Sequence, residues 1–464
     1  MQSGQTHLFG ASNASIPNAG KAVVHRTHAG QVRHDWLSAC AEERALTSGI
    51  MEEVVLPLNL LRSYRKVVSN AGSAGTDGMT VKELGKWLRT NLTKLQDQLL
   101  NGSYQPLPVR GVEIPKPKGG HRQLGIPTVI DRLVQQAIHQ VLSPRYERVF
   151  SEHSYGFRQH KSAHQALEQA GSYVSEGNSH VIDLDLEKFF DKVNHNRLIW
   201  LLSTRIGDGR VLSLMGKILR SGILTGGLIQ QRTEGTPQGS PLSPLLSNIV
   251  LDELDKELER RAHRYVRYAD DVKIFAKSEK SANRIQANIT KHIEQKLKLK
   301  VNRDKSRICR SYELNFLGHS ILYDGRLALS KESEARLKEK IKAITSRRRG
   351  ESFAAILQQL QTQLRGWLAY FSKANMKKKI IAIERWMKRK VRCYRLKQCK
   401  RTIGIVRLLR SLGVEEKLCW RTGLSGKGWW RKSNSPGINI GLSNQWLYGQ
   451  GYYSLQLHYE KLKR

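Results

Sequence analysis

Hydrophobic and polar residues alternate along residues 182–186, where Ile182, Leu184 and Leu186 take turns with Asp183 and Asp185. A period of two is the pattern of a β-strand with one buried face. Both aspartates therefore leave the face opposite the apolar one. Acidic residues in mid-strand run against β propensity and against burial preferences. Such conflicts between local rule and placement occur mainly at functional sites.

Two short apolar segments, residues 264–268 and 272–276, predict a pair of strands, and Asp270 and Asp271 lie between them. Two acids at a turn usually mark only a solvated turn. The acidic strand upstream changes this interpretation, because three or four carboxylates converge if it lies beside the hairpin. Such a group would repel itself unless a cation neutralised it. Carboxylate oxygens are ligands that Mg²⁺ prefers.

Stripes of apolar residues predict several helices. One covers residues 131–142 and ends before Pro144, because the residue preceding a proline disfavours the helical conformation. Another follows the hairpin, with Ile285, Ile289, Ile293 and Leu297 on one side, and should pack beneath the sheet. A long amphipathic helix is predicted over residues 353–371. Strands, hairpin and covering helices together indicate an α+β fold.

Composition narrows the class of protein. Lysine and arginine number 78 against 40 acids, a formal charge of +38, so a polyanionic partner is expected, nucleic acid first. No apolar run approaches the length of a membrane span, and the N-terminus has no continuous apolar signal core. The five cysteines form no C-x-x-C pair, which argues against a zinc module or a disulfide framework. We therefore expect a soluble cytoplasmic protein, associated with nucleic acid and not with a membrane.

Further motifs follow one another along the chain in a definite order and spacing. They are residues 114–127 (with Lys116 and Arg122), 154–164 (Ser154-Tyr-Gly-Phe-Arg158, then His164), 185–191, 235–244, 268–271, 299–306 and 316–318, and Gly366-Trp367-Leu-Ala-Tyr-Phe371 in the long helix. In order and spacing they resemble reverse transcriptases encoded by group II introns. The resemblance covers most of the chain from about Asn59 onward. The last motif resembles the signature of the maturase domain in this family.

The resemblance implies a right-hand polymerase, with fingers and an antiparallel palm sheet, followed by an α-helical thumb and maturase domain. We expect a poorly ordered segment at residues 1–35 and an N-terminal extension with the start of the fingers at residues 36–110. Fingers and palm should occupy residues 111–328. The thumb and maturase domain, with a basic C-terminal region, should occupy residues 329–464. Because cysteine pairs are absent, the metal-dependent endonuclease that ends many relatives is not expected.

The resemblance also implies roles for particular residues. Asp185, Asp270 and Asp271 are the expected catalytic residues and would hold two Mg²⁺ ions, with Mn²⁺ as a substitute. Asp185 is chosen over Asp183 because the family has an aromatic residue five positions after this ligand, here Phe190; Asp183 remains a candidate for a supporting role. Phe190 would exclude ribonucleotides, although a plain core aromatic is an equal alternative.

The remaining candidates bind substrates. The nucleotide would contact Lys116, Arg122, Phe190, Gln238, Gly239 and Lys305; the primer grip would be Phe316, Leu317 and Gly318; intron RNA would contact Arg385, Lys388, Arg389 and Arg392. The last four recur at helical spacings of three and four and so share one face. For Lys305 a surface lysine, and for the basic run a solvated helix face, are the alternatives.

The resulting hypothesis is an RNA-directed DNA polymerase that binds its group II intron RNA, assists splicing and copies the RNA during retrohoming. Its partners would be intron RNA, an RNA template with a DNA primer, deoxynucleoside triphosphates and target DNA. A non-enzymatic RNA-binding splicing cofactor is one alternative. A domesticated or retron-like reverse transcriptase in phage defence is another.

Overall fold

The computed structural model describes residues 49–115, 119–237 and 239–463. Lys116 and Gln238, both predicted to bind the nucleotide, lie outside the described residues, as do Cys40 and the segment 1–35. The chain folds into two compact units that do not follow its order. The first comprises the described residues up to Val141 together with His195–Thr233; the second comprises Leu142–Asn194 and the described residues from Glu234 on.

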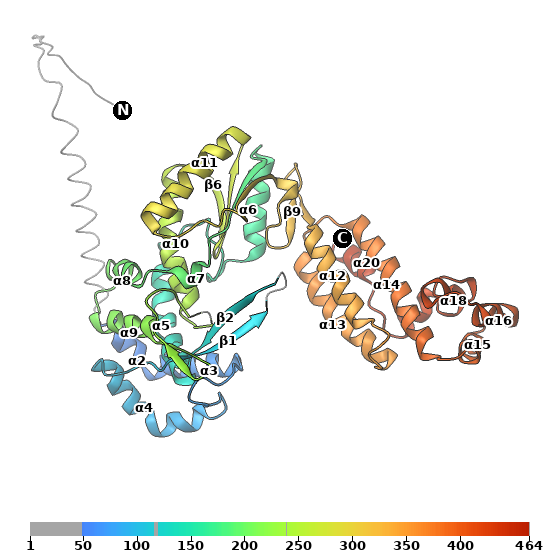
Figure 1. Ribbon diagram of the computed structural model, residues 1–464, viewed down its shortest axis with the longest axis horizontal. Coiled ribbons are helices and arrows are strands. Elements are labelled where there is room, and N and C mark those ends of the chain that lie inside the picture. Colours follow the sequence, from blue (N-terminus) through green and yellow to red (C-terminus); the bar gives the residue numbers. More distant parts are fainter. Residues whose placement is uncertain (1–48, 116–118, 238, 464) are drawn as a thin grey trace, which may run out of the picture. The chain divides into compact units, whose positions relative to one another are not determined.

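The first unit combines helices with a four-stranded sheet of order β2-β1-β4-β5 (Figure 1). Strands β1 and β2 form an antiparallel hairpin, whereas β1 runs parallel to β4. The elements are α2 (Ile50–Val55), α3 (Pro57–Ser69), α4 (Leu84–Leu100), β1 (Val109–Pro115), β2 (His121–Ile126), the start of α5 (Val129–Glu147), α8 (His195–Ser203), α9 (Gly209–Arg220), β4 (Ile223–Thr225) and β5 (Leu228–Gln230).

Helix α5 corrects one prediction. It continues through Pro144 to Glu147 instead of ending before the proline. A proline removes only one hydrogen bond when it lies in the last turn, and packing offsets this loss. Tyr146 and Phe150 are both buried just beyond it, with stacked rings whose centroids lie 5.9 Å apart. Burial of two aromatic rings thus outweighs the local preference.

The second unit is built on a fully antiparallel sheet of order β6-β7-β3-β8. Its strands are β3 (His180–Leu184), β6 (Arg264–Tyr268), β7 (Asp271–Ala276) and β8 (Arg307–Arg310). The acidic strand β3 lies directly beside β7 of the hairpin, with Asp183 opposite Lys273 and Leu184 opposite Val272. The predicted juxtaposition of the two acidic segments, and the predicted antiparallel palm sheet, are therefore confirmed.

Helices cover both faces of this sheet (Figure 1). Helix α6 (Ala163–Ser175) packs on the face that carries Val181, Val266 and Phe275, which is also the face of Asp183 in the strand alternation. Helix α11 (Glu279–His292), extended by a π-helical turn at Ile293–Leu297, packs on β3, β7 and β8. Helix α10 (Ser243–Arg260) and the short α7 (Phe189–Lys192) complete this region. The predicted helix after the hairpin is thus confirmed.

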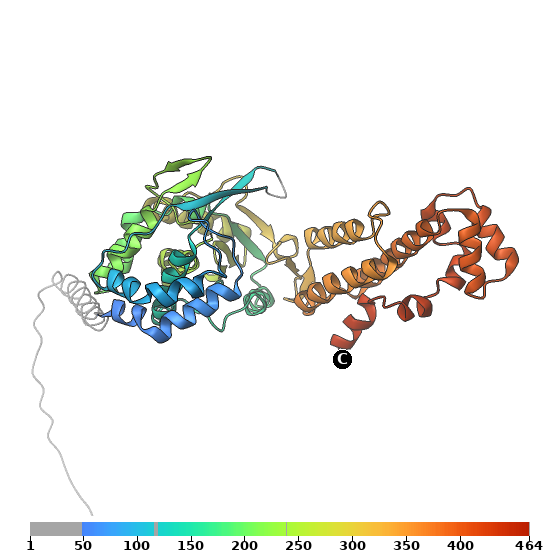
Figure 2. The ribbon, with the colours of Figure 1, turned by 90° about the horizontal axis from the view of Figure 1, so that it is seen from below.

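A small hairpin, β9 (His319–Ile321) and β10 (Leu327–Leu329), leads into the C-terminal helices. From residue 331 on, the described residues carry helices and no strand (Figure 2, orange to red). Helix α13 has the bounds that were predicted from its apolar stripe. The helices are α12 (Lys331–Ile344), α13 (Phe353–Phe371), α14 (Lys377–Gln398), α15 (Thr402–Ser411), α16 (Glu416–Leu424), α17 (Trp429–Lys432), α18 (Pro436–Gly441), α19 (Asn444–Gly449) and α20 (Leu455–Leu462).

Two apolar clusters hold these helices together. One joins α12, α13, α14 and α20, and the other joins the end of α14 to α15, α16 and α18. Within the described part of the chain, no helix is long and apolar enough to cross a membrane. The four described cysteines are unpaired thiols.

Candidate active site

Three carboxylates lie at one end of the central strands, β3 and β7, of the antiparallel sheet. The register ends with Leu184 opposite Val272, so Asp185, the residue after β3, and Asp271, the first residue of β7, lie at the same end of the two strands. Asp270 precedes Asp271 in the two-residue turn between β6 and β7, where Tyr268 pairs with Asp271. All three aspartates are half-buried. The structure therefore places the three residues that were predicted as catalytic at the same end of β3 and β7.

Lysines partner these carboxylates. The buried Lys273 forms ion pairs with both Asp183 and Asp271. Burial opposes the charge of Lys273, but these two carboxylates raise its pKa above the usual value. Burial also raises the pKa of Asp271 above its usual value, and the opposing effect of Lys273 is smaller. Lys305 Nζ lies 3.4 Å from Asp185 Oδ2 on the exposed side. Positive charge is therefore already part of this edge.

The donor atoms suit a hard divalent cation, because all are carboxylate oxygens, from the end of β3, from the β6–β7 turn and from the start of β7. In the described residues, however, no three His, Cys, Asp or Glu side chains are grouped as a metal site. Two of the three carboxylates are instead paired with lysine ammonium groups. A cation bound here would provide the same neutralisation that the ammonium groups provide in this structure.

The segment after the hairpin helix supports Asp185. Backbone N–H of Asn302 donates to Asp185 O at 2.8 Å, and backbone N–H of Asp185 donates to Ser306 Oγ at 3.0 Å. Leu186 forms an isolated bridge with Val301. The motif at residues 299–306 thus lies along the end of β3. This motif therefore positions the backbone of Asp185 and also brings the charge of Lys305 close to the Asp185 carboxylate.

The turn that carries Asp270 has a strained conformation and a buried support. Ala269 has φ of +59°, which a type II′ turn requires at its first central position and which normally favours glycine. Arg267, fully buried, donates from Nη1 to Ala269 O at 2.9 Å and to Asn248 Oδ1 at 2.9 Å. Its Nε donates to Asp255 Oδ1 at 2.8 Å. A buried guanidinium therefore ties the turn to helix α10.

The motif at residues 154–158 packs behind the same turn. Tyr155 N–H donates to Arg267 O at 2.8 Å, and Asn248 Nδ2 donates to Gly156 O at 2.9 Å. A Cβ at Gly156 would collide with the backbone of Ala269, so only glycine allows this approach. Sequence reasoning found the motif but missed Arg267, Asn248 and Asp255. The one available signal was Arg267 itself, an arginine between Val266 and Tyr268 in a predicted strand.

Phe190 lies half-buried in α7, next to the motif at residues 235–244. Thr236 N–H donates to Phe190 O at 2.6 Å, and Gly235 N–H donates to Val193 O at 2.7 Å. Gly239 is exposed with φ of +118°. These two motifs are thus joined by backbone hydrogen bonds. In the first unit, Arg122 lies exposed on β2 opposite Ile114 of β1.

The three residues predicted as the primer grip form a tight turn. Phe316 and His319 exchange backbone hydrogen bonds of 2.9 Å in both directions, and Leu317 and Gly318 lie between them. Both central residues have positive φ, +50° and +81°. Phe316 is fully buried, and the Lys273 ammonium lies 5.7 Å from its ring centroid. The turn therefore touches the same lysine that pairs with Asp271.

Comparisons with known proteins agree with this geometry. Residues 114–321 match the family described as reverse transcriptase (RNA-dependent DNA polymerase), and residues 335–410 match the group II intron, maturase-specific domain. Protein YkfC of Escherichia coli is 34% identical over 321 residues, which are 59% of this chain and 82% of YkfC. The group II intron-encoded protein LtrA of Lactococcus lactis subsp. cremoris is 30% identical over 325 residues. The chain belongs to the group II intron reverse transcriptases.

The predicted family, right-hand fold class and enzyme class are thereby confirmed. The match to LtrA covers 56% of this chain and 54% of LtrA. The chain thus spans about half the length of LtrA. Among solved structures, a partial Cas6-RT-Cas1--Cas2 complex aligns with 53% of this chain and 42% of that chain, at 25% identity and a TM-score of 0.35. Membership implies catalysis with divalent metal ions, and binding of intron RNA and of a template with its primer.

The four predicted RNA-binding residues of this reverse transcriptase share one face of α14, but they do not form one open surface. Arg385 is exposed, whereas Arg392 is buried and donates to Leu442 O at 2.9 Å. Lys388 pairs with Glu384 at 3.3 Å. The Arg389 guanidinium lies 3.9 Å from the ring centroid of Trp430. Three of the four thus contact neighbouring parts of the fold.

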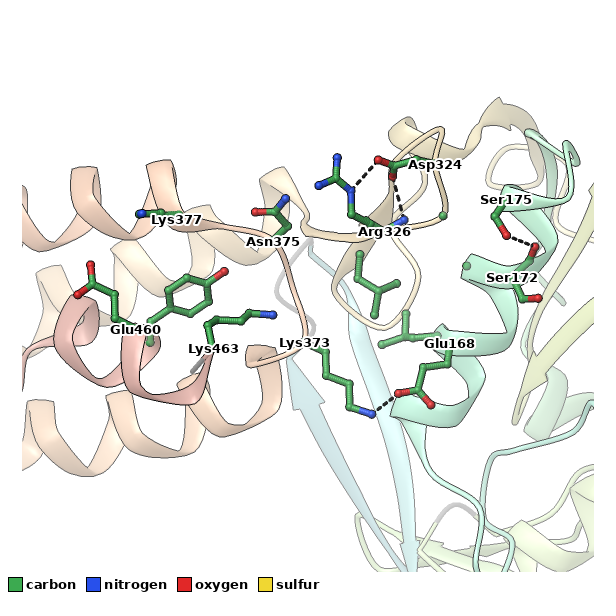
Figure 3. Close-up of a pocket in the computed structure, with 15 residues that line it drawn as sticks. Glu168, Ser172, Ser175, Asp324, Arg326, Lys373, Asn375, Lys377, Glu460 and Lys463 are labelled. Atoms are coloured by element: carbon green, nitrogen blue, oxygen red, sulfur yellow. Dashed lines mark hydrogen bonds and ion pairs between the residues drawn. The ribbon is translucent and has the colours of Figure 1, made fainter.

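A cavity of about 1220 Å³ lies away from the carboxylates of the reverse transcriptase, between α6, the β9–β10 turn, α14 and α20. Figure 3 shows its charged lining, in which Lys373 pairs with Glu168, and Arg326 pairs with Asp324 at 2.6 Å. Its lining mixes both signs of charge, since Glu168, Asp324 and Glu460 face Arg326, Lys373, Lys377 and Lys463, so the cavity offers no concentrated charge of one sign for a ligand. It does show that the end of α13 is joined to α6 through an ion pair.

Proposed function

We propose that this reverse transcriptase copies RNA into DNA at the edge formed by Asp185, Asp270 and Asp271. The observation that supports this most strongly is the register of β3 and β7, because its last pair, Leu184 and Val272, leaves Asp185 and Asp271 at the same end of the two strands, next to the hairpin turn. Three carboxylates at one sheet edge are costly unless cations neutralise them. Nucleotidyl transfer is a reaction that uses such cations.

In this proposal Asp185, Asp270 and Asp271 hold two Mg²⁺ ions, which Mn²⁺ can replace. When bound, such a pair stabilises the attacking and leaving oxygens of an in-line displacement at phosphorus. Lys273 keeps the charge of the site balanced through its ion pairs with Asp183 and Asp271. Asp183 accordingly takes the supporting role for which the sequence made it a candidate.

The nucleotide would be held by charged and backbone groups from several motifs. Lys116 and Arg122 suit the triphosphate, as a point charge and a bidentate fork. Gln238 and Gly239 belong to the segment that bonds to the Phe190 backbone through Thr236. In this position Phe190 would clash with a ribose 2′-hydroxyl. Lys305, exposed and near Asp185, can give a proton to the leaving pyrophosphate.

We also propose that the chain binds its group II intron RNA, assists splicing and copies the intron into target DNA during retrohoming. Its charge of +38 supports a nucleic-acid partner. The exposed basic residues on and just after α14 are the candidate contacts that remain open to solvent: Lys377, Lys378, Arg385, Lys397 and Lys400. Phosphates of folded RNA, read by shape, are the expected ligands.

A primer-extension assay on an RNA template tests the polymerase. Asp270→Asn should abolish DNA synthesis, because a neutral amide cannot replace a carboxylate shared by cations, while binding to intron RNA persists. Asp324→Asn is the matched control, since it removes one charge from a half-buried aspartate in the β9–β10 turn and should keep both activities. Substantial synthesis by Asp270→Asn would refute the site. A wild-type protein that binds intron RNA but never extends a primer would favour a non-enzymatic splicing cofactor.

A further inference from the structure

The primer-grip turn needs an external restraint. Leu317 has φ of +50°, in the left-handed region that residues with a Cβ adopt only at an energetic cost. Two consecutive positive φ values are those of a type I′ turn, which favours Asn-Gly over Leu-Gly. The local sequence therefore does not select this conformation. Contacts from elsewhere in the fold must stabilise it.

Helix α13 supplies such a contact. The Tyr370 hydroxyl donates to Leu317 O at 2.9 Å. The turn is packed closely against this helix and against α12, because a Cβ at Gly318 would lie 3.1 Å from Phe371 Cζ on α13 and 2.8 Å from Ser333 Oγ on α12. Nδ1 of His319, whose pKa burial lowers to about 4, lies 3.1 Å from the same carbonyl oxygen. Two side chains thus converge on Leu317 O.

Tyr370 is itself held by helix α6, which packs on the sheet. His164 Nε2, on α6, lies 2.7 Å from Tyr370 O, and the two rings are 5.5 Å apart between centroids. Lys373, one turn further along, pairs with Glu168 of the same helix (Figure 3). Both His164 and Tyr370 belong to motifs for which no role in the chemistry has been found. A continuous series of contacts therefore runs from α6 through Tyr370 to the turn.

We propose that Tyr370 is a positioning residue for the primer: its hydroxyl holds the Leu317–Gly318 turn in the conformation that receives the primer end. The inference rests on the proposed polymerase function and on the primer-grip role of this turn. A tyrosine within the maturase-type motif of α13 then also serves DNA synthesis. His164 acts one step further away, by holding the backbone of Tyr370.

The test uses Tyr370→Phe, which removes only the hydroxyl, and single-nucleotide extension of a pre-annealed DNA primer on an RNA template. One hydrogen bond corresponds to a roughly two- to tenfold loss of kcat/KM. The loss should appear mainly in the KM for primer-template, and extension from a mismatched primer end should change relative to a matched one. The unfolding temperature should fall by only about 2–4 °C, the effect of one lost hydrogen bond, and the affinity for intron RNA should stay as in wild type. Tyr323→Phe, in an 80% exposed tyrosine, is the matched control.

A second variant separates positioning from general packing. Leu317→Asn creates the residue pair that favours a type I′ turn, so it should remove the need for the hydroxyl. Tyr370→Phe should therefore cost less than about twofold in a Leu317→Asn background. An equal cost in both backgrounds, or no cost in the wild-type background, would overturn the inference alone. A wild-type protein that extends no primer would overturn the proposed function and this inference together.

Discussion

Asp255→Asn should destabilise the protein strongly, although Asp255 touches no substrate. The substitution keeps the shape of the side chain but removes the charge opposite Arg267, and both side chains are fully buried. Burial alone lowers the pKa of Arg267, but Asp255 raises it above the usual value, so the guanidinium stays charged. Breaking a buried ion pair costs about 3–5 kcal/mol, because the remaining charge keeps its desolvation penalty.

This magnitude is easy to measure. At about 2–4 °C per kcal/mol, the expected loss lowers the unfolding temperature by about 6–20 °C. Thermal unfolding followed by circular dichroism reports it directly. Asp324→Asn is again the control, because a half-buried aspartate in a surface turn, paired with Arg326, should change stability by less than about 0.5 kcal/mol. An Asp255→Asn protein that unfolds within a degree of wild type would refute the reasoning.

An apolar double replacement separates stability from catalysis. Arg267→Met combined with Asp255→Leu removes both charges, and such replacements are often neutral or stabilising. Thermal stability should therefore recover. The variant still lacks the Nη1 donor that binds Ala269 O, so the turn with Asp270 loses its support. Primer extension should remain roughly 10- to 100-fold below wild type, as expected for small displacements at an active site. Full recovery of both properties would show that Arg267 serves the fold alone.

Four further predictions concern nucleotide specificity, RNA binding and stability. Phe190→Val should admit ribonucleotides, measured as the ratio of ribo- to deoxynucleotide incorporation; an unchanged ratio would make Phe190 a core residue. Affinity for RNA should fall with salt, with a log–log slope of roughly −0.7 per phosphate contact; a flat response would point to another partner. Arg392→Ala should cost about 1–3 kcal/mol of stability, because it leaves Leu442 O without its donor. Arg385→Ala should instead weaken RNA binding at unchanged stability, and the reverse pattern would contradict these assignments.

Much of the candidate site could be predicted because it depends on short-range periodicity. The alternation of Asp183 and Asp185 with leucines set both acids on one strand face, and the stripe of α13 predicted its bounds at both ends. Such patterns follow from the period of the strand or helix and need no knowledge of distant contacts. The family motifs then added the pairing of this strand with the hairpin, which no local pattern contains.

Only the tertiary structure decided which polar residues support the fold and which stay free. Arg267 and Arg392 look like other basic residues in the sequence, yet both are buried. Their hydrogen-bond partners lie 12 and 50 residues away, so no local pattern shows that these two arginines are paired. The contact between Tyr370 and Leu317 joins positions 53 apart. The sequence by itself thus determined most of the elements and the place of each acid along them, since both follow from local period. Hydrogen-bond partners are set by packing between distant segments, so the supports of the catalytic turn and of the primer-grip turn appear only in the folded chain.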